Sequence, residues 1–150
     1  MPKKQPKAAF GSDVRTKSPR IGVTESYHNH RPSWRIAKIE LEDRDDPFGW
    51  HLVDDVAAEK IRAGLANFES MTWAEILVDG KKGNHSVATS KICKAASDRL
   101  FAMRLDDVDQ LVSLRLSNKQ RVWGILHQGV LDLLWWDPNH EVCPWQGKDN

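Results

Sequence analysis

The run of apolar residues at positions 130–136 constrains the fold more than any other part of the sequence. It reads VLDLLWW, with Asp132 as its one charged residue, and it lies between Gln128-Gly129 and Asp137-Pro138. Gln-Gly and Asp-Pro pairs are typical of turns. A short apolar run bounded by turns predicts a central strand that is buried on both faces of a sheet.

Two further segments before this strand carry a strand pattern. Val112, Leu114 and Leu116 alternate with polar residues, as in a strand with one buried face. Residues 117–119 read SNK, which favours a turn, and residues 120–127 predict a second strand. The last third of the chain therefore predicts an antiparallel β-meander.

The segment before the meander has helical periodicity. Asp54 or Asp55 is expected to cap a helix that carries apolar residues at helical spacing (Val56, Ile61, Leu65 and Phe68). Thr72 and Glu75 have the S/T-x-x-E spacing of a capping box, which predicts a short helix over residues 73–78.

The remaining elements complete the predicted architecture. A third helix fits residues 89–104, and residues 34–41 predict a strand with a shift of phase, as a bulge would cause. The sequence therefore predicts an α+β fold, in which an N-terminal strand and about three helices are followed by the C-terminal antiparallel meander.

The net charge of +1 conceals an uneven distribution. Residues 1–20 hold six basic residues and one acidic residue, a net charge of +5, and the rest of the chain carries −4. Basic segments with few apolar residues cannot offset the entropy of ordering. We therefore expect a disordered basic arm at 1–30, one domain at 31–145 and a flexible tail at 146–150. The arm either contacts phosphates or only adds solubility.

Several classes of protein do not fit the sequence. No apolar run reaches the ~18 residues of a membrane-spanning helix, so no membrane partner is expected. The two cysteines, Cys93 and Cys143, form no disulfide framework, which favours a reduced, cytoplasmic protein. His140 and Cys143 lack a second ligand pair, and no phosphate-binding glycine motif is present. We therefore expect neither a metal nor a cofactor.

The C-terminal motifs resemble known bacterial proteins. The sequences RVWG at 121–124 and LWWDPNHEVCP at 134–144 resemble the C-terminal signature of a group of small bacterial proteins of unknown function. The helices followed by LRL at 114–116, a turn, RVW at 121–123 and an apolar strand resemble RelE-type toxins of toxin–antitoxin pairs. The likeness covers about residues 50–143.

The resemblance to RelE-type toxins carries expectations about structure and function. It implies two helices before a small twisted antiparallel sheet, cleavage of mRNA on the ribosome without a metal, and an inhibitory antitoxin-like partner. Several of those nucleases end in Tyr or His-Tyr. The nearest match here is His140, which is followed by Glu141.

The residues themselves offer the groups that metal-free RNA cleavage needs. That reaction requires a base, an acid and cations around the phosphate. Arg121, His140 and His85 are the candidate catalytic residues, and Lys81, Lys82 and Arg115 are the candidate RNA-binding residues. Asp137 lies three positions before His140, where a carboxylate could orient the imidazole. A catalytic role requires Arg121, His85 and His140 to converge on one cleft.

Each candidate also has a structural interpretation. Arg115 and Arg121 fit ordinary solvent-facing positions of a sheet, the Lys81-Lys82 loop fits a solvated surface, and His140 fits a turn that bonds its own backbone. Of Trp135 and Trp136, one is expected to remain available for a groove, an interface or base stacking. The alternative function is a non-enzymatic regulatory module that binds nucleic acid or protein through the same sheet and arm.

Overall fold

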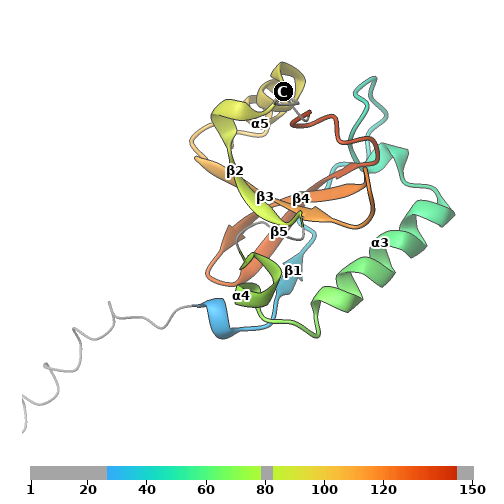
Figure 1. Cartoon of the computed structure of the whole chain (residues 1–150). Coiled ribbons are helices and arrows are strands. Elements are labelled where there is room, and N and C mark those ends of the chain that lie inside the picture. Colours follow the sequence, from blue (N-terminus) through green and yellow to red (C-terminus); the bar gives the residue numbers. More distant parts are fainter. Residues whose placement is uncertain (1–26, 79–82, 145–150) are drawn as a thin grey trace, which may run out of the picture.

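The computed structural model of the chain describes residues 27–78 and 83–144 (Figure 1). The expectations for residues 1–26 of the arm, for Lys81 and Lys82, and for the tail at 146–150 lie outside the described residues.

A mixed sheet of five strands organises the described part of the chain (Figure 1). The strand order is β1-β5-β4-β3-β2, with β1 parallel to β5 and every other pair antiparallel. The predicted meander is β3-β4-β5, and it occupies the centre. The strands are β1 (Ser33–Arg35), β2 (His85–Ala88), β3 (Gln110–Arg115), β4 (Arg121–His127) and β5 (Val130–Asp137).

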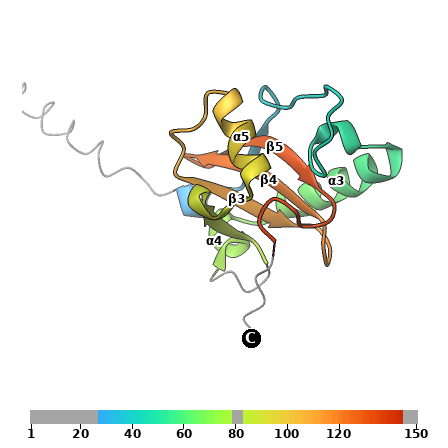
Figure 2. The ribbon, with the colours of Figure 1, turned by 90° about the horizontal axis from the view of Figure 1, so that it is seen from above.

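Helices cover both faces of the sheet (Figure 2). On one face, α3 (Asp55–Phe68) and α4 (Trp73–Ile76) pack in a hydrophobic cluster with Leu131 and Trp136. On the other face, α5 (Lys94–Ala102) packs in a second cluster. The 3₁₀ helices that the structure describes in full are η1 (Tyr27–Asn29), η2 (Trp50–Leu52) and η4 (Thr89–Lys91). The fold is therefore α+β, as the sequence predicts.

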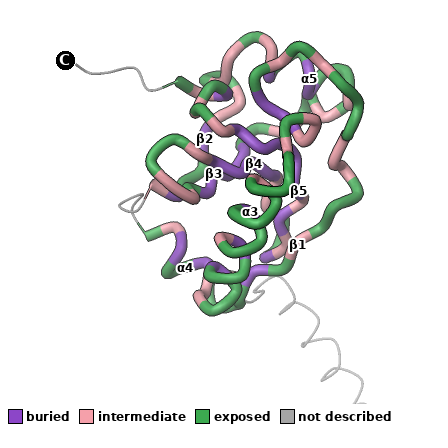
Figure 3. The backbone as a smooth tube through the Cα atoms, turned by 90° about the vertical axis from the view of Figure 1, so that its right-hand side faces the viewer, coloured by how far each residue is buried: buried purple, intermediate pink, exposed green. Residues whose placement is uncertain are grey.

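Burial of β5 on both faces is confirmed (Figure 3). Trp136 belongs to the cluster under α3 and α4, whereas Trp135 belongs to the cluster under α5. Their exposed fractions are 2% and 0%. The prediction that one of this pair remains available for stacking is therefore wrong, because helices cover both faces of the sheet.

The predicted starts of α3 and α4 are also confirmed. Asp54 caps α3, where its side chain accepts a hydrogen bond of 2.8 Å from the backbone N–H of Ala57. Thr72 and Glu75 form the capping box that begins α4. The Glu75 carboxylate accepts from the Thr72 backbone N–H at 2.8 Å, and the Thr72 hydroxyl accepts from the Glu75 N–H at 3.3 Å.

Some predicted boundaries are wrong. The predicted helix at 89–104 begins only at Lys94, because Thr89–Lys91 form η4 after the edge strand β2. The predicted strand at 34–41 ends at Arg35, and Ile36 and Leu41 are 70% and 74% exposed. Ile39 packs against the cluster under α3 and α4, so the apolar spacing beyond Arg35 reflects one packing contact and no continued strand. No helix of the described residues is long and apolar enough to cross a bilayer.

Candidate functional site

Four strand ends meet at one end of the sheet. Here β2 begins at His85, β3 ends at Arg115, β4 begins at Arg121 and β5 ends at Asp137. Arg115 lies opposite Arg121, and Arg121 lies opposite Asp137 in the strand register. The strand order β5-β4-β3-β2 thus gathers residues that are up to 52 positions apart in the sequence.

Arg121 is largely buried at this end, with 8% of its surface exposed. Its Nη1 donates to the carbonyl oxygens of Ser117, Asn118 and Gln120 at 2.9, 3.2 and 3.2 Å, which closes the β3–β4 turn. Burial lowers the pKa of the guanidinium, the charge of Arg115 lowers it further, and Asp137 opposes the change. The guanidinium still remains charged at neutral pH, because arginine does not deprotonate in proteins.

Arg121 and His140 line the same surface pocket, which has a volume of about 520 Å³. One wall comes from the β3–β4 turn and the other from the segment after β5. Lys119 also lines the pocket, and the sequence interpretation missed it although it lies in the predicted turn just before Arg121. The lining residues are Asn118, Lys119, Arg121, Asn139, His140, Glu141 and Pro144.

Asp137 organises the turn that carries His140. Its fully buried carboxylate accepts from the backbone N–H groups of Glu141 and Val142 at 2.7 and 3.0 Å. His140 adopts a left-handed conformation with φ of 59°, which histidine tolerates better than most residues. Its Nδ1 is buried and has no hydrogen-bond partner among the described residues. Asp137 therefore positions the backbone around His140 and does not bind Nδ1 of its ring.

His85 lies within electrostatic reach of both other candidates. Partial burial of the ring lowers its pKa most, and the positive charges of Arg121 and His140 lower it further. The side chain is exposed and does not line the 520 Å³ pocket. The structure thus brings Arg121 and His140 into one pocket, with His85 outside its lining but within electrostatic reach, so the convergence required for catalysis is met for two of the three residues.

Arg115 is an exposed cation at the same end of the sheet. Its Nε donates to the Ser117 carbonyl at 3.2 Å, and its side chain packs over Gly83. A Cβ at Gly83 would lie 2.6 Å from Arg115 Cδ, and the φ of Gly83 is 84°. Glycine is therefore required where the loop crosses this arginine.

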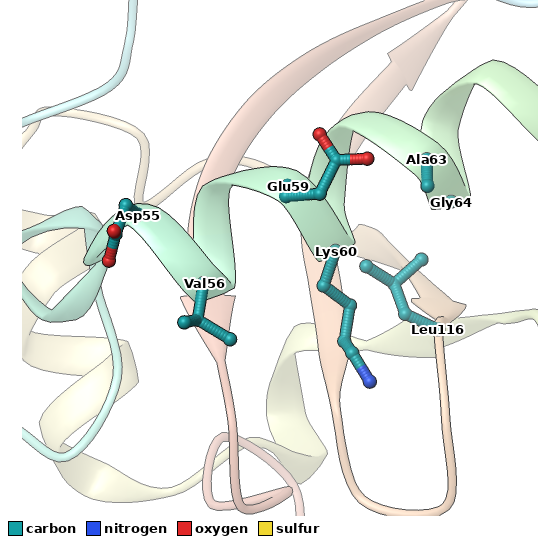
Figure 4. A pocket seen from close by; sticks show the side chains of 7 residues that line it. All are labelled: Asp55, Val56, Glu59, Lys60, Ala63, Gly64 and Leu116. Carbon is teal, nitrogen blue, oxygen red and sulfur yellow. The ribbon is translucent and has the colours of Figure 1, made fainter.

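A larger pocket of about 710 Å³ lies elsewhere, between α3 and the end of β3 (Figure 4). Leu116 faces the helix there, and the charged residues of the lining are Asp55, Glu59 and Lys60. The lining of this larger pocket contains no arginine, imidazole or thiol. The pocket of Arg121 and His140 is therefore the better candidate for phosphate binding and proton transfer. Its lining residues are Asp55, Val56, Glu59, Lys60, Ala63, Gly64 and Leu116.

Within residues 27–78 and 83–144, no three His, Cys, Asp or Glu side chains are grouped so that they could hold a metal ion. Comparisons with protein-family models, curated proteins and solved structures find no match for this chain.

Proposed function

We propose that the protein binds RNA at the pocket of Arg121 and His140 and cleaves it without a metal ion, as its resemblance to RelE-type toxins implies. The observation that carries this proposal is the grouping of Arg121, Lys119 and His140 around one pocket, with His85 beside it. Cations and imidazoles in one place supply both phosphate binding and proton transfer near neutral pH.

The proposed roles follow from the charge of each group. Lys119 and Arg121 neutralise the phosphate as negative charge develops on it. His85, whose lowered pKa keeps it neutral at pH 7, accepts the proton of the attacking 2′-hydroxyl. His140 donates a proton to the leaving 5′ oxygen. Arg115, exposed at the same end of the sheet, contacts a neighbouring phosphate.

One observation favours the second candidate, a non-enzymatic module that binds nucleic acid or protein. A catalytic imidazole is usually oriented by a hydrogen bond to its second nitrogen. Among the described residues, His140 Nδ1 is buried without such a partner, and the oxygens of the Asp137 carboxylate are bonded elsewhere. In that case, the same cations bind RNA but no strand is cut.

Cleavage assays on the purified full chain distinguish the two candidates. Labelled RNA in EDTA, and translating ribosomes in a magnesium buffer, are each incubated with wild type, His85→Ala and His140→Ala. The matched control is His127→Ala, because His127 is exposed at the opposite end of β4. We expect wild type and the control to yield 2′,3′-cyclic phosphate ends, and each site variant to lose about 10²-fold or more in rate.

The opposite results are equally informative. If wild type is as inert as the site variants, and its expression does not slow cell growth, cleavage and the toxin role are wrong. Binding that persists in wild type and weakens in Arg121→Gln then supports the non-enzymatic module. If neither protein binds RNA, RNA cleavage and RNA binding are both wrong for this pocket, and of the second candidate only protein binding is left.

The basic arm requires a separate test. Its net charge of +5 over residues 1–20 predicts contacts with phosphates in addition to those of the pocket. RNA affinity is measured against salt concentration for the full chain and for a chain without residues 1–20. We expect the truncated chain to bind more weakly and with a shallower dependence on salt. Identical curves would exclude the arm from binding.

A further inference from the structure

The two cysteines of the described residues lie next to each other in the fold. Cys93 occupies the N-cap position of α5 without a side-chain cap hydrogen bond, and Cys143 lies in the segment that follows β5. The backbone N–H of Cys93 donates to the carbonyl of Val142, the residue before Cys143, at 2.7 Å. One backbone hydrogen bond thus joins Cys93 to the neighbour of Cys143. A disulfide needs its two Cα atoms roughly 4.4–6.8 Å apart, a spacing that such neighbouring backbones can adopt.

Their side chains share surroundings as well. Both cysteines are free and half-buried, and both pack against the hydrophobic cluster under α5. The Sγ of Cys143 donates to the carbonyl of Lys91, two residues before Cys93, at 3.5 Å. Neither thiol is fully enclosed, so a small reagent can reach them.

The thiol of Cys143 is not strongly activated. Partial burial raises the pKa of the Cys143 thiol, and the positive charge of Lys91 lowers it. Cys93 and Asp137 raise this pKa further. The influence of Cys93 on this pKa agrees with their proximity. Since the thiolate is the reacting form, exchange at Cys143 is expected to speed up as the pH rises.

We propose that Cys93 and Cys143 form a redox-sensitive pair that closes to an internal disulfide by exchange with a low-molecular-weight disulfide. One cysteine thiolate attacks the reagent, breaks its S–S bond and releases one small thiolate. The other cysteine thiolate then attacks the protein sulfur of the mixed disulfide and releases the second. The two cysteines lose two electrons, the reagent gains them, and the two protons end on the released thiols.

This disulfide would restrain one wall of the candidate site. Cys143 lies between Glu141 and Pro144, which both line the pocket of Arg121 and His140. A bond to Cys93 would fasten that wall of the pocket to the start of α5. The regulatory role rests on the proposed function, whereas disulfide formation does not.

Thiol mapping tests the disulfide itself. The full chain is equilibrated with oxidised and reduced glutathione, its free thiols are alkylated, and its mass and peptides are measured. We expect wild type to lose two hydrogens and to yield a peptide that links Cys93 to Cys143, with its near-ultraviolet circular dichroism retained. Cys93→Ser and Cys143→Ser should each stop at the glutathione adduct. Persistent adducts on wild type, linked dimers, absence of reaction, or a disulfide that forms only with unfolding would overturn the proposal.

RNA binding to the reduced and oxidised forms tests the regulatory role. We expect a several-fold difference in affinity between the two forms, and no such difference for Cys143→Ser. Equal affinities would overturn regulation of the pocket. Absence of RNA binding in both forms, together with a mapped disulfide, would instead count against the proposed function.

Discussion

The indole Nε1 of Trp123 donates a 3.0 Å hydrogen bond to the carboxylate of Asp137, and both side chains are almost fully buried. The same carboxylate accepts from the backbone of Glu141 and Val142. A buried carboxylate is thus satisfied by three N–H donors. It connects β4 to the turn that forms one wall of the candidate site.

Replacement of Asp137 by alanine should be strongly destabilising. Three buried or partly buried donors would lose a charged acceptor, and each hydrogen bond to a charged group contributes about 1.5–3 kcal/mol. Because such contributions are not additive, we expect the free energy of unfolding to fall by roughly 3–5 kcal/mol in urea titrations. Asp98→Ala is the control, since Asp98 is exposed and pairs with the exposed Lys94 on α5. Equal losses in the two variants would contradict this account.

The meander and the helix starts could be predicted because their signals are local. The Gln128-Gly129 turn has φ values of 50° and 87°, which match a two-residue hairpin. Asp54 and Thr72 cap their helices through residues three positions away. By contrast, β2 has only four residues and no distinct apolar pattern. β1 has only three residues, and it pairs with β5, which is distant in the sequence. Such pairing depends on tertiary packing that periodicity does not encode.

The candidate site could be predicted only in part. The sequence identifies Arg121, His85 and His140 by their chemistry, but their proximity depends on the strand order. The expectation that Asp137 orients the His140 imidazole is wrong, because a carboxylate three residues before a histidine gives no sign that backbone N–H groups bind it instead. The burial of Arg121 likewise depends on the turn that encloses its guanidinium.

Two glycines should respond differently to alanine. A Cβ at Gly124 would lie 2.5 Å from the backbone oxygen of Asp132, which cannot move without disturbing the β4–β5 ladder. We expect Gly124→Ala to lower the free energy of unfolding by about 2–3 kcal/mol. At Gly64 in α3, the nearest atom is the end of the flexible Leu116 side chain, and alanine favours the helix by about 1 kcal/mol. Gly64→Ala should therefore be near neutral in the same denaturation assay, and equal losses would refute the distinction.

Arg99 should contribute more to stability than the exposed cation on the same helix. Its side chain is 7% exposed and pairs with Glu40 and Asp46 at 2.9 Å each. Arg99→Met keeps most of the apolar part of the side chain but removes the cation that pairs with Glu40 and Asp46. These two carboxylates would then lose that partner while being only partly exposed to water. We expect a loss of roughly 2–3 kcal/mol, below the 3–5 typical of a fully buried pair. Lys94→Met, which removes an exposed pair, should change stability by about 0–1 kcal/mol. Thermal or urea unfolding that ranks them in the reverse order would contradict this prediction.

The pKa of His85 offers the most direct test of the site's electrostatics. It should lie below the ordinary value of about 6.5 in a nuclear magnetic resonance titration. Arg121→Gln and His140→Gln should each raise it, but only part of the way, because burial is the larger cause. Arg62→Gln, an exposed change on α3, should leave it unaltered.

The same shift fixes the direction of two pH dependences. Because the folded state lowers the pKa of His85, the unfolded state binds the proton more readily. The contribution of neutral His85 to the free energy of unfolding is therefore fully present above about pH 6.5. This contribution is lost as the pH falls through the folded-state pKa. If His85 is the base, the acid limb of kcat/KM should follow this pKa and move to higher pH in His140→Gln or Arg121→Gln wherever activity remains measurable. An acid limb that stays fixed while the pKa measured for His85 rises would exclude His85 as the base.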